Sequence, residues 1–421
     1  MKNSPEISKI KTLEILDSRG NPTVRVMIET KDGNQSFANV PSGASTGTRE
    51  ALELRDSNPK KYHGKGVSKA LKNIEKKIFP LLKGRNVTKQ EEIDKFLIKL
   101  DNTENKSKLG ANAILGVSLA CARAGAAYYN LPLFRYLQKT FGFKKAKKMP
   151  NPMLNLINGG AHADSGIDIQ EYMVIPAGIR PFSKKMRAAS EIFIALGKLL
   201  KSKKLSTAVG NEGGYAPKVN SNIQVLKLID TAIKNAGYKV GKDIFFGIDA
   251  AASEFYNPRQ KKYNLKLDKK KLTPVEIIKM YEAWMKKYPF LLMEDPLAED
   301  DWESWSIMQE KIGKKLTIIG DDLTVTNTKW LAKAIKEKTC NAVLIKVNQI
   351  GSLTETIECI RLAQKNRFKV AVSHRSGETC DSFISDLTVA VGADFIKSGA
   401  PSRSERLAKY NRLLEIENWE K

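Results

Sequence analysis

The first part of the chain alternates hydrophobic and polar residues as β-strands do, and then changes to helical spacing. Every second position is apolar in one such segment, at Val24, Val26 and Ile28. The pair Asp32-Gly33 supplies a turn before a second strand, which is predicted over 36–40. Three helices are predicted where apolar residues recur every three or four positions, over 67–79, 89–100 and 111–129. This block predicts a small α+β domain.

After a connector at 143–152, rich in lysine and closed by two prolines, the pattern changes to short apolar runs that end in polar residues. These runs lie at 245–248, 290–293, 316–319, 342–345, 370–373 and 395–396. Each is followed by a segment with helical spacing, and Thr273, Pro274 and Glu276 mark one helix start. Repeated strand–helix units predict an α/β barrel over 141–421, behind the α+β domain over 1–140. A doubly wound open sheet is the alternative, but no glycine-rich dinucleotide turn opens the region.

Chemically useful side chains stand just beyond these apolar runs. They are Asp249, Glu294, Asp321, Lys346, His374 and Lys397. In a barrel the carboxyl ends of successive parallel strands converge on one face, so we expect these residues to be neighbours. Three carboxylates there would bind a hard divalent cation such as Mg²⁺ through oxygen. A single carboxylate is more often a loop residue or a helix cap, but three in consecutive units favour a metal site.

Lys346 follows a buried strand, which leaves two interpretations of its role. It is either paired with a carboxylate such as Asp321 or Glu294, or its pKa is lowered enough for it to act as a base. A nearby cation and a second lysine, Lys397, would favour the neutral form that proton abstraction requires. Sequence alone leaves both interpretations open.

Three glycine-containing turns hold further candidate groups. Residues 210–214 surround Glu212, residues 158–162 end in His162, and residues 42–47 have the small, polar composition of a lid or a phosphate loop. Turns of this kind are more often plain loops, so each of them alone is a weak signal.

The composition of the chain bears on which kinds of molecule the protein binds and where it is located. The chain has 71 Lys and Arg against 46 Asp and Glu, a net charge of +25, which raises the question of nucleic acid or an anionic membrane. The lysines are spread along helix-like segments, no nucleic-acid-binding motif is present, and the same charge would steer phosphorylated metabolites to the protein. Four cysteines without a CxxC pair predict reduced thiols and a cytoplasmic location. We expect neither export nor membrane insertion, because no apolar stretch is long enough.

The chain resembles the enolase family from about residue 8 to residue 416. The motifs that carry this resemblance are DSRGNPT at 17–23, SGASTG at 42–47, NKSKLGAN at 105–112, GGYAP at 213–217, EDP at 294–296, GDDL at 320–323, NQIGS at 348–352 and SHRSGET at 373–379. The resemblance implies an α/β fold in which an N-terminal α+β capping domain precedes a modified eight-stranded barrel with an antiparallel second strand.

The resemblance also implies an activity, the reversible dehydration of 2-phosphoglycerate to phosphoenolpyruvate by a carbon–oxygen lyase of glycolysis and gluconeogenesis. It implies two Mg²⁺ per site, the second arriving with substrate, and a homodimer or a larger ring of dimers. Lys346 resembles the base, and Glu212, aided by Glu171, the acid. The implied metal ligands are Asp249, Glu294, Asp321 and Ser45, with Asp322 behind them. The implied substrate contacts are His162, Gln170, His374, Arg375, Ser376 and Lys397.

Three positions depart from the family pattern. Asn211 replaces the usual aspartate beside the proposed acid, Cys380 replaces an acidic residue, and Arg25 replaces a common glutamate. Two alternatives are therefore kept. One is another dehydratase or racemase of the same superfamily. The other is a protein, with or without turnover, that binds RNA or plasminogen through its basic surface, with a fraction of it located at the cell surface. RNA binding of that kind would be sensitive to salt.

Overall fold

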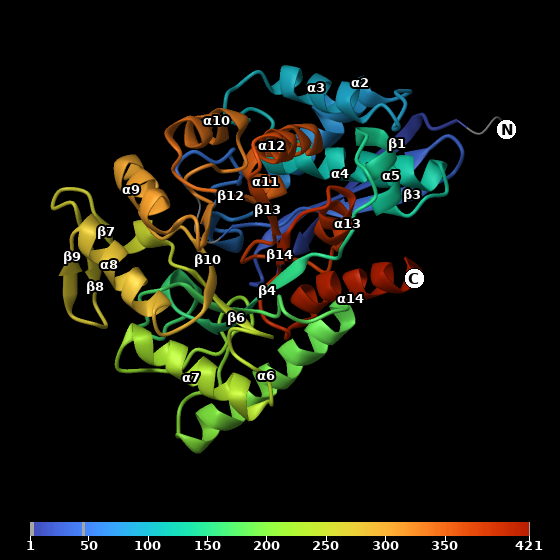
Figure 1. Cartoon of the computed structure of the whole chain (residues 1–421). Coiled ribbons are helices and arrows are strands. Elements are labelled where there is room, and N and C mark those ends of the chain that lie inside the picture. The colour runs from blue at the N-terminus through green and yellow to red at the C-terminus, as the bar shows by residue number, and fades with distance from the viewer. Residues whose placement is uncertain (1–3, 44–46, 421) are drawn as a thin grey trace.

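The computed structural model describes residues 4–43 and 47–420, and it shows a small N-terminal unit packed against a closed barrel (Figure 1). The N-terminal unit begins with an antiparallel sheet of β1 (Ile7–Leu16), β2 (Pro22–Thr30) and β3 (Gln35–Asn39). Its helices are α1 (Ser68–Asn73), α2 (Phe79–Leu82), α3 (Gln90–Asp101), α4 (Ala111–Tyr128) and α5 (Leu133–Phe141). A single π-helical segment, Ile74–Ile78, joins α1 to α2. The helices predicted in this unit are therefore present, the first with a π-helical insertion.

The alternation of apolar and polar residues explains how the sheet packs against its helices. Val24, Val26 and Ile28 lie on one face of β2 and are fully buried, and α4 packs against β2 and β3. The helix α4 is apolar on nearly all sides, so it is buried along most of its length. This packing gives the unit an apolar interior that is continuous with the core of the barrel.

Eight strands close the barrel. In chain order they are β4 (Asn151–Asn158), β5 (Glu171–Ile175), β6 (Phe245–Asp249), β10 (Phe290–Glu294), β11 (Thr317–Gly320), β12 (Ala342–Ile345), β13 (Lys369–Ser373) and β14 (Phe395–Lys397). The strand β5 pairs antiparallel with both neighbours, and the other barrel pairs are parallel. The predicted barrel, with one antiparallel strand in second place, is confirmed.

Helices surround the barrel. They are α6 (Phe182–Ser202), α7 (Asn222–Asn235), α8 (Pro274–Met285), α9 (Trp302–Ile312), α10 (Thr328–Glu337), α11 (Val347–Ile350), α12 (Leu353–Lys365), α13 (Phe383–Ala390) and α14 (Ser404–Trp419). The predicted start of α8 is confirmed, since Thr273 and Glu276 form a complete capping box. A small side sheet of β7 (Tyr256–Asn257), β8 (Lys262–Leu265) and β9 (Lys270–Leu272) precedes it.

The N-terminal unit covers the end of the barrel at which the strands β12 and β13 finish. Backbone bonds join Ser42 to Gly377 in both directions at 2.8 Å, and the Ser18 N–H donates to the carbonyl of Glu378 at 2.7 Å. Arg123 of α4 forms a partly buried ion pair with Asp381 at 2.7 Å. Because residues 377–381 follow β13, these contacts place the unit over the carboxyl ends of the strands. Among the described residues, no helix is both long and apolar enough to cross a bilayer.

Candidate active site

The six polar residues predicted from the apolar runs lie at one end of the barrel. Asp249, Glu294 and Lys397 are the last residues of β6, β10 and β14, whereas Asp321, Lys346 and His374 directly follow β11, β12 and β13. The register pairs Asp249 with both Glu171 and Glu294. A small cleft forms between them, with a volume of about 20 Å³, which is roughly room for one water molecule. Its walls are His162, Gln170, Glu171, Glu212, Asp249, Lys346, Ser373, His374, Arg375, Ser376 and Lys397.

Lys397 holds one side of this cleft together. Its Nζ lies 2.9 Å from Asp249, 2.8 Å from Glu294 and 3.0 Å from Glu171, and all four side chains are almost fully buried. Burial and the neighbouring charge of Asp249 raise the pKa of Glu294 well above its usual range. Burial disfavours the ammonium, but the surrounding carboxylates outweigh it and raise the pKa of Lys397. This lysine is therefore a fixed positive charge.

Lys346 is paired with a carboxylate on the other side of the cleft. Its Nζ forms an ion pair with Asp321 Oδ2, and Gln349 donates to Asp321 Oδ1 at 2.9 Å. Burial lowers the pKa of Lys346, but the negative charge of Asp321 outweighs burial and the net pKa is raised. Lys346 is therefore protonated as long as Asp321 remains its counter-ion.

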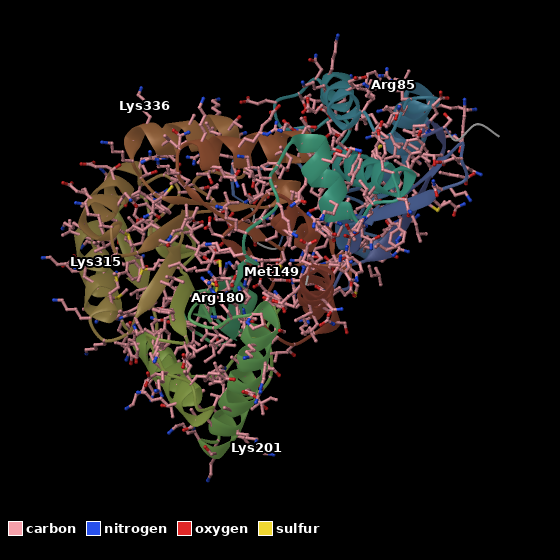
Figure 2. The ribbon with its side chains drawn as sticks, turned by 45° about the vertical axis from the view of Figure 1, so that its right-hand side comes forward. Arg85, Met149, Arg180, Lys201, Lys315 and Lys336 are labelled. Carbon is pink, nitrogen blue, oxygen red and sulfur yellow. The ribbon has the colours of Figure 1, made fainter. Side chains whose placement is uncertain are left out.

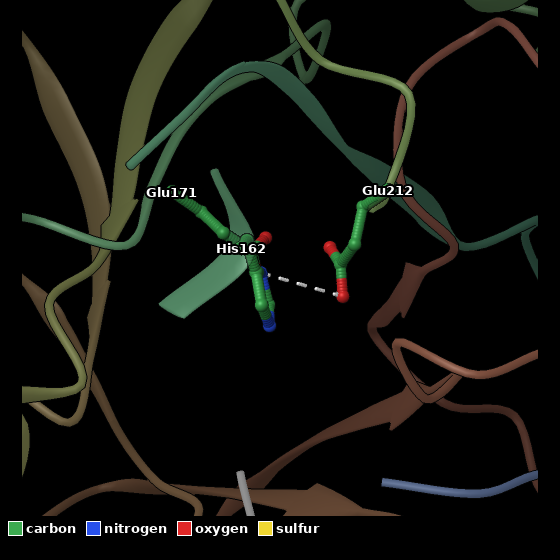
Figure 3. Close-up of side chains that lie close together, drawn as sticks. All are labelled: His162, Glu171 and Glu212. Carbon is green, nitrogen blue, oxygen red and sulfur yellow. Dashed lines mark ion pairs between the residues drawn. The ribbon is translucent and has the colours of Figure 1, made fainter. Parts of the chain in front are cut away.

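Glu171 and Glu212 face the same imidazole across the cleft (Figure 3). His162 Nδ1 lies 3.6 Å from Glu171 and 3.7 Å from Glu212. Asn155 donates to Glu212 at 3.2 Å from inside the barrel. Burial and the charge of Glu212 raise the pKa of Glu171 well above its usual range. Of these two carboxyl groups, Glu171 is thus the one on which the surroundings favour a proton more strongly.

His374 approaches Glu212 from the opposite side. Its Nδ1 lies 2.7 Å from Arg406 Nη1, and since a guanidinium can only donate, Nδ1 accepts and the ring proton sits on Nε2. Nε2 lies 3.3 Å from Glu212 Oε2. Burial lowers the pKa of His374 to about 3, so the ring is neutral and directs an N–H dipole at Glu212. Burial alone would raise the pKa of Glu212, but His374, His162 and Lys397 together hold it well below its usual range.

Arg375 is bound by a carboxylate from the N-terminal unit. Glu50 accepts from Nη1 at 2.8 Å and from Nη2 at 3.0 Å, and Asn348 accepts from Nη1 at 2.9 Å. Glu50 also accepts the backbone N–H of Gly47 at 3.1 Å, directly after the segment 44–46. The predicted metal ligand Ser45 lies in that segment, outside the described residues. Both side chains are buried. Because Glu50 belongs to the N-terminal unit and Arg375 lines the cleft, this pair joins the cap to the cleft.

The donor set of the cleft fits a hard divalent cation. Four carboxyl groups (Glu171, Asp249, Glu294 and Asp321) pair with the ammonium groups of Lys397 and Lys346, and Glu212 lies beside His162 and His374, so the carboxyl groups outnumber the ammonium groups. Two buried acceptor oxygens that belong to cleft-lining side chains, Gln170 Oε1 and Glu171 Oε2, have no hydrogen-bond donor in the described chain. Asp295, Asp321 and Asp322 also place ligand oxygens within 4.8 Å of one another. Oxygen donors with excess negative charge are what Mg²⁺ prefers.

Asn211 is anchored through its backbone, directly before Glu212. Its carbonyl accepts from Arg403 at 3.1 Å and from Arg406 at 2.9 Å, and its N–H donates to the carbonyl of His162 at 3.0 Å. These bonds do not depend on whether residue 211 is Asn or Asp, so the turn that carries Glu212 keeps its anchors.

Several groups that support the cleft carry no local sequence signal. Arg406 is fully buried in α14 and donates to the ring nitrogen of His374, to the carbonyl of Ser376 at 2.7 Å and to the carbonyl of Arg375 at 2.6 Å. Asp295 accepts the backbone N–H groups of Asp321 at 2.8 Å and Asp322 at 2.9 Å. Asn155 and Glu50 complete this set. Their roles arise from tertiary contacts, and only the EDP motif that contains Asp295 could have pointed to one of them.

A capped barrel with an acidic cleft, lysines and an arginine at the carboxyl ends of its strands defines the class of barrel enzymes that carry their functional residues on that face. Family models agree with this architecture over nearly the whole chain. The model for the enolase N-terminal domain matches residues 7–137, and the model for the enolase C-terminal TIM barrel domain matches residues 146–420. The chain therefore belongs to the enolase family, whose members are lyases and dehydratases of the enolase superfamily.

Proposed function

We propose that this chain catalyses the reversible, Mg²⁺-dependent dehydration of 2-phosphoglycerate to phosphoenolpyruvate. The observation that carries the proposal is the single cleft in which Lys346, Lys397, Arg375 and the pair Glu171–Glu212 converge. The family match supports the same reaction class. In the forward direction the C2–H and C3–O bonds break, a C2–C3 double bond forms, and water leaves.

Lys346 is the proposed base for the C2 proton. A base must be neutral, and the ion pair with Asp321 is what keeps this lysine protonated. Asp249, Glu294 and Asp321 are the groups that would hold Mg²⁺, which when bound supplies positive charge against these carboxylates and against the substrate carboxylate. With Asp321 engaged in this way, Lys346 would lose the interaction that raises its pKa. Ser45 remains the proposed ligand of a second Mg²⁺.

Lys397 is the proposed stabiliser of the charge that follows proton removal. Loss of the C2 proton leaves a dianionic carboxylate, and a fixed ammonium that needs no reorganisation lowers the energy of that state. The contacts of Lys397 with Asp249, Glu171 and Glu294 keep it charged and in place.

The proposed acid for the C3 hydroxyl is Glu212 acting with Glu171. Burial and the charge of Glu212 raise the pKa of Glu171, which favours a proton on this pair, and His162 lies within 3.7 Å of both carboxylates. That proton leaves with the hydroxyl as water. His374 directs its Nε2–H toward Glu212 Oε2, 3.3 Å away.

Arg375 and Ser376 are the proposed contacts for the substrate phosphate, and His162 and Gln170 the remaining substrate contacts. A guanidinium offers a planar fork of donors that matches phosphate oxygens. Glu50 occupies this fork in the described chain, so phosphate binding requires the segment around residues 47–50 to adjust.

The biological setting that we propose follows from the family relationship. It is a cytoplasmic role in glycolysis and gluconeogenesis, carried out by a homodimer or a ring of dimers. Another superfamily dehydration or racemisation is the second candidate reaction, and nonspecific binding of RNA by the basic surface could accompany turnover.

The test is formation of phosphoenolpyruvate, followed by its ultraviolet absorbance, with 2-phosphoglycerate in the presence of Mg²⁺ or EDTA. We expect Mg²⁺-dependent turnover in the wild type and its loss in Lys346→Ala. Lys369→Ala is the matched control, because Lys369 is the first residue of β13 and lies at the other end of the same barrel wall. A folded wild type that binds Mg²⁺ but leaves 2-phosphoglycerate unchanged would refute the proposal and favour another reaction of the superfamily.

A further inference from the structure

A second cavity lies at the end of the barrel opposite the cleft. It is lined by Asn151, the first residue of β4, and by Ala177, which follows the antiparallel strand β5. Asn151 pairs with Phe395, the first residue of β14, and Ile175 pairs with Phe245, the first residue of β6. These pairings place the cavity at the amino ends of the parallel strands. We call it the basal cavity; its volume is about 480 Å³, in the range of small-molecule sites.

Basic residues dominate the lining of the basal cavity. Lys147, Lys148, Arg180 and Lys185 line it, against a single carboxylate, Glu417. Met149 and Arg180, which both line the cavity, lie close together at the front of the molecule in Figure 2. The lysine-rich connector that the sequence marks as a linker thus forms one wall of a cavity.

The single carboxylate is already engaged by the protein. Glu417 accepts the backbone N–H of Phe182 at 2.5 Å and that of Ser183 at 3.0 Å, at the N-terminus of α6. Within the described chain, no ion pair within 4.0 Å involves Lys147, Arg180 or Lys185, and Lys148 makes only a long contact of 3.8 Å with Asp394. The basal cavity therefore has an excess of positive charge that the protein does not neutralise.

Lys185 is the most constrained of these cations. Its side chain is buried, with the residue only 6% exposed, and its ammonium donates to the neutral amide oxygen of Asn151. Burial lowers the pKa of Lys185 to about 8, and the charges of Arg180 and Lys148 act in the same direction, whereas Glu417 opposes them. A buried ammonium without an anionic partner is unfavourable, and a bound anion would relieve this cost.

We propose that the basal cavity binds a small dianion of the phosphate class, as inorganic phosphate or as the phosphate group of an ester, between Arg180 and Lys185. Arg180 supplies a planar fork for two oxygens, Lys185 supplies a point charge at the bottom of the cavity, and Lys147 and Lys148 neutralise the remaining charge at its rim. The amides at the start of α6 are taken by Glu417, so the side chains recognise the anion. This site is independent of the proposed catalytic function, because it shares no residue with the cleft.

The test is calorimetric titration of the full-length protein with inorganic phosphate at pH 7 in EDTA, at an ionic strength held constant with chloride. In Arg180→Gln we expect the Kd of one class of phosphate site to rise by about tenfold or more, since a charge-assisted contact is lost. Lys185→Met should have the same effect. Lys201→Met, at an exposed position on the same helix, should leave the titration unchanged.

The variants distinguish phosphate binding in the basal cavity from phosphate binding at the catalytic cleft. A site that survives unchanged in Arg180→Gln is not in the basal cavity, and an isotherm identical to that of the wild type would overturn the proposal even if Lys185→Met fails to fold. Repeating the titration with glycerol phosphate distinguishes the two sources of the anion. Binding of both ligands supports a site for phosphate esters, and binding of inorganic phosphate alone supports a site for the free ion.

Discussion

Replacing Lys397 with methionine tests whether the surrounding carboxylates form a cation site. In the wild type this ammonium neutralises Asp249, Glu294 and Glu171 at 2.8–3.0 Å. Methionine keeps a side chain of similar length and removes the charge. In EDTA the variant therefore contains buried carboxylates without a counter-ion, whereas in Mg²⁺ the cation can replace the missing charge.

The magnitude follows from the burial of these groups. Removing one partner of a buried ion pair costs about 3–5 kcal/mol. Glu171 and Glu294, whose pKa values are already raised, can take up protons and offset part of this cost, so we expect about 3 kcal/mol. At roughly 2–4 °C per kcal/mol for a large domain, the melting temperature in EDTA falls by about 6–12 °C. Mg²⁺ at about one hundred times its Kd would restore about 2.7 kcal/mol.

The assay is thermal unfolding of the wild type and the variant in EDTA and in excess Mg²⁺. Lys409→Met is the matched control, because Lys409 is equally buried and is paired with Glu378 at 2.7 Å, outside the cleft. Both variants should be destabilised in EDTA, but only Lys397→Met should gain more from Mg²⁺ than the wild type does. An equal gain in all three proteins would refute the reasoning, since the carboxylates around Lys397 would then not take up the cation.

Two further predictions concern buried titratable groups. Because the pKa of His374 is about 3 in the fold and about 6.5 in the unfolded chain, the unfolded chain binds more protons between these values, and the free energy of unfolding falls as the pH falls through that window. Urea titrations of His374→Gln should show a smaller fall, by a few kcal/mol at most, and an unchanged slope would mean that the folded ring is charged. Cys380 is exposed, whereas Cys121, Cys340 and Cys359 are buried and burial raises their pKa values, so a disulfide reagent at pH 8 should modify one thiol per native chain and four after denaturation. Rapid modification of a second thiol in the native chain would contradict this assignment.

Sequence patterns predicted most of the barrel because its parallel strands share one arrangement. In β6, β10, β11, β12, β13 and β14 an apolar run enters the barrel and a polar residue ends or directly follows it. The strand β5 runs the other way, so its polar residue, Glu171, precedes the apolar run. The strand β4 is interrupted by Asn155, which is fully buried because it faces Glu212. Residue spacing alone therefore predicted neither strand, and the family resemblance supplied the antiparallel one.

The candidate site was predictable where its residues lie at strand ends. Their position at strand ends predicts that Lys346, Lys397 and the three carboxylates are neighbours, and the ion pairs Lys346–Asp321, Lys397–Asp249 and Lys397–Glu294 connect them. The pairing of Arg375 with Glu50, across 325 positions of sequence, depends on how the two units dock, and no local pattern encodes it. The assigned roles, and the domain boundary between residues 140 and 141, remain proposals.

The pairing of Glu50 with Arg375 has a consequence for how the chain matures. Glu50 leaves the ribosome long before Arg375, so the cleft can be completed only when the last part of the barrel has been synthesised and returns to a cap that is already folded. A protease cut in the exposed connector near residues 144–148 would spare every residue that lines the cleft. If the halves then separated, the barrel would keep a buried guanidinium without its carboxylate, so loss of activity after such a cut would report separation of the halves rather than damage to the cleft.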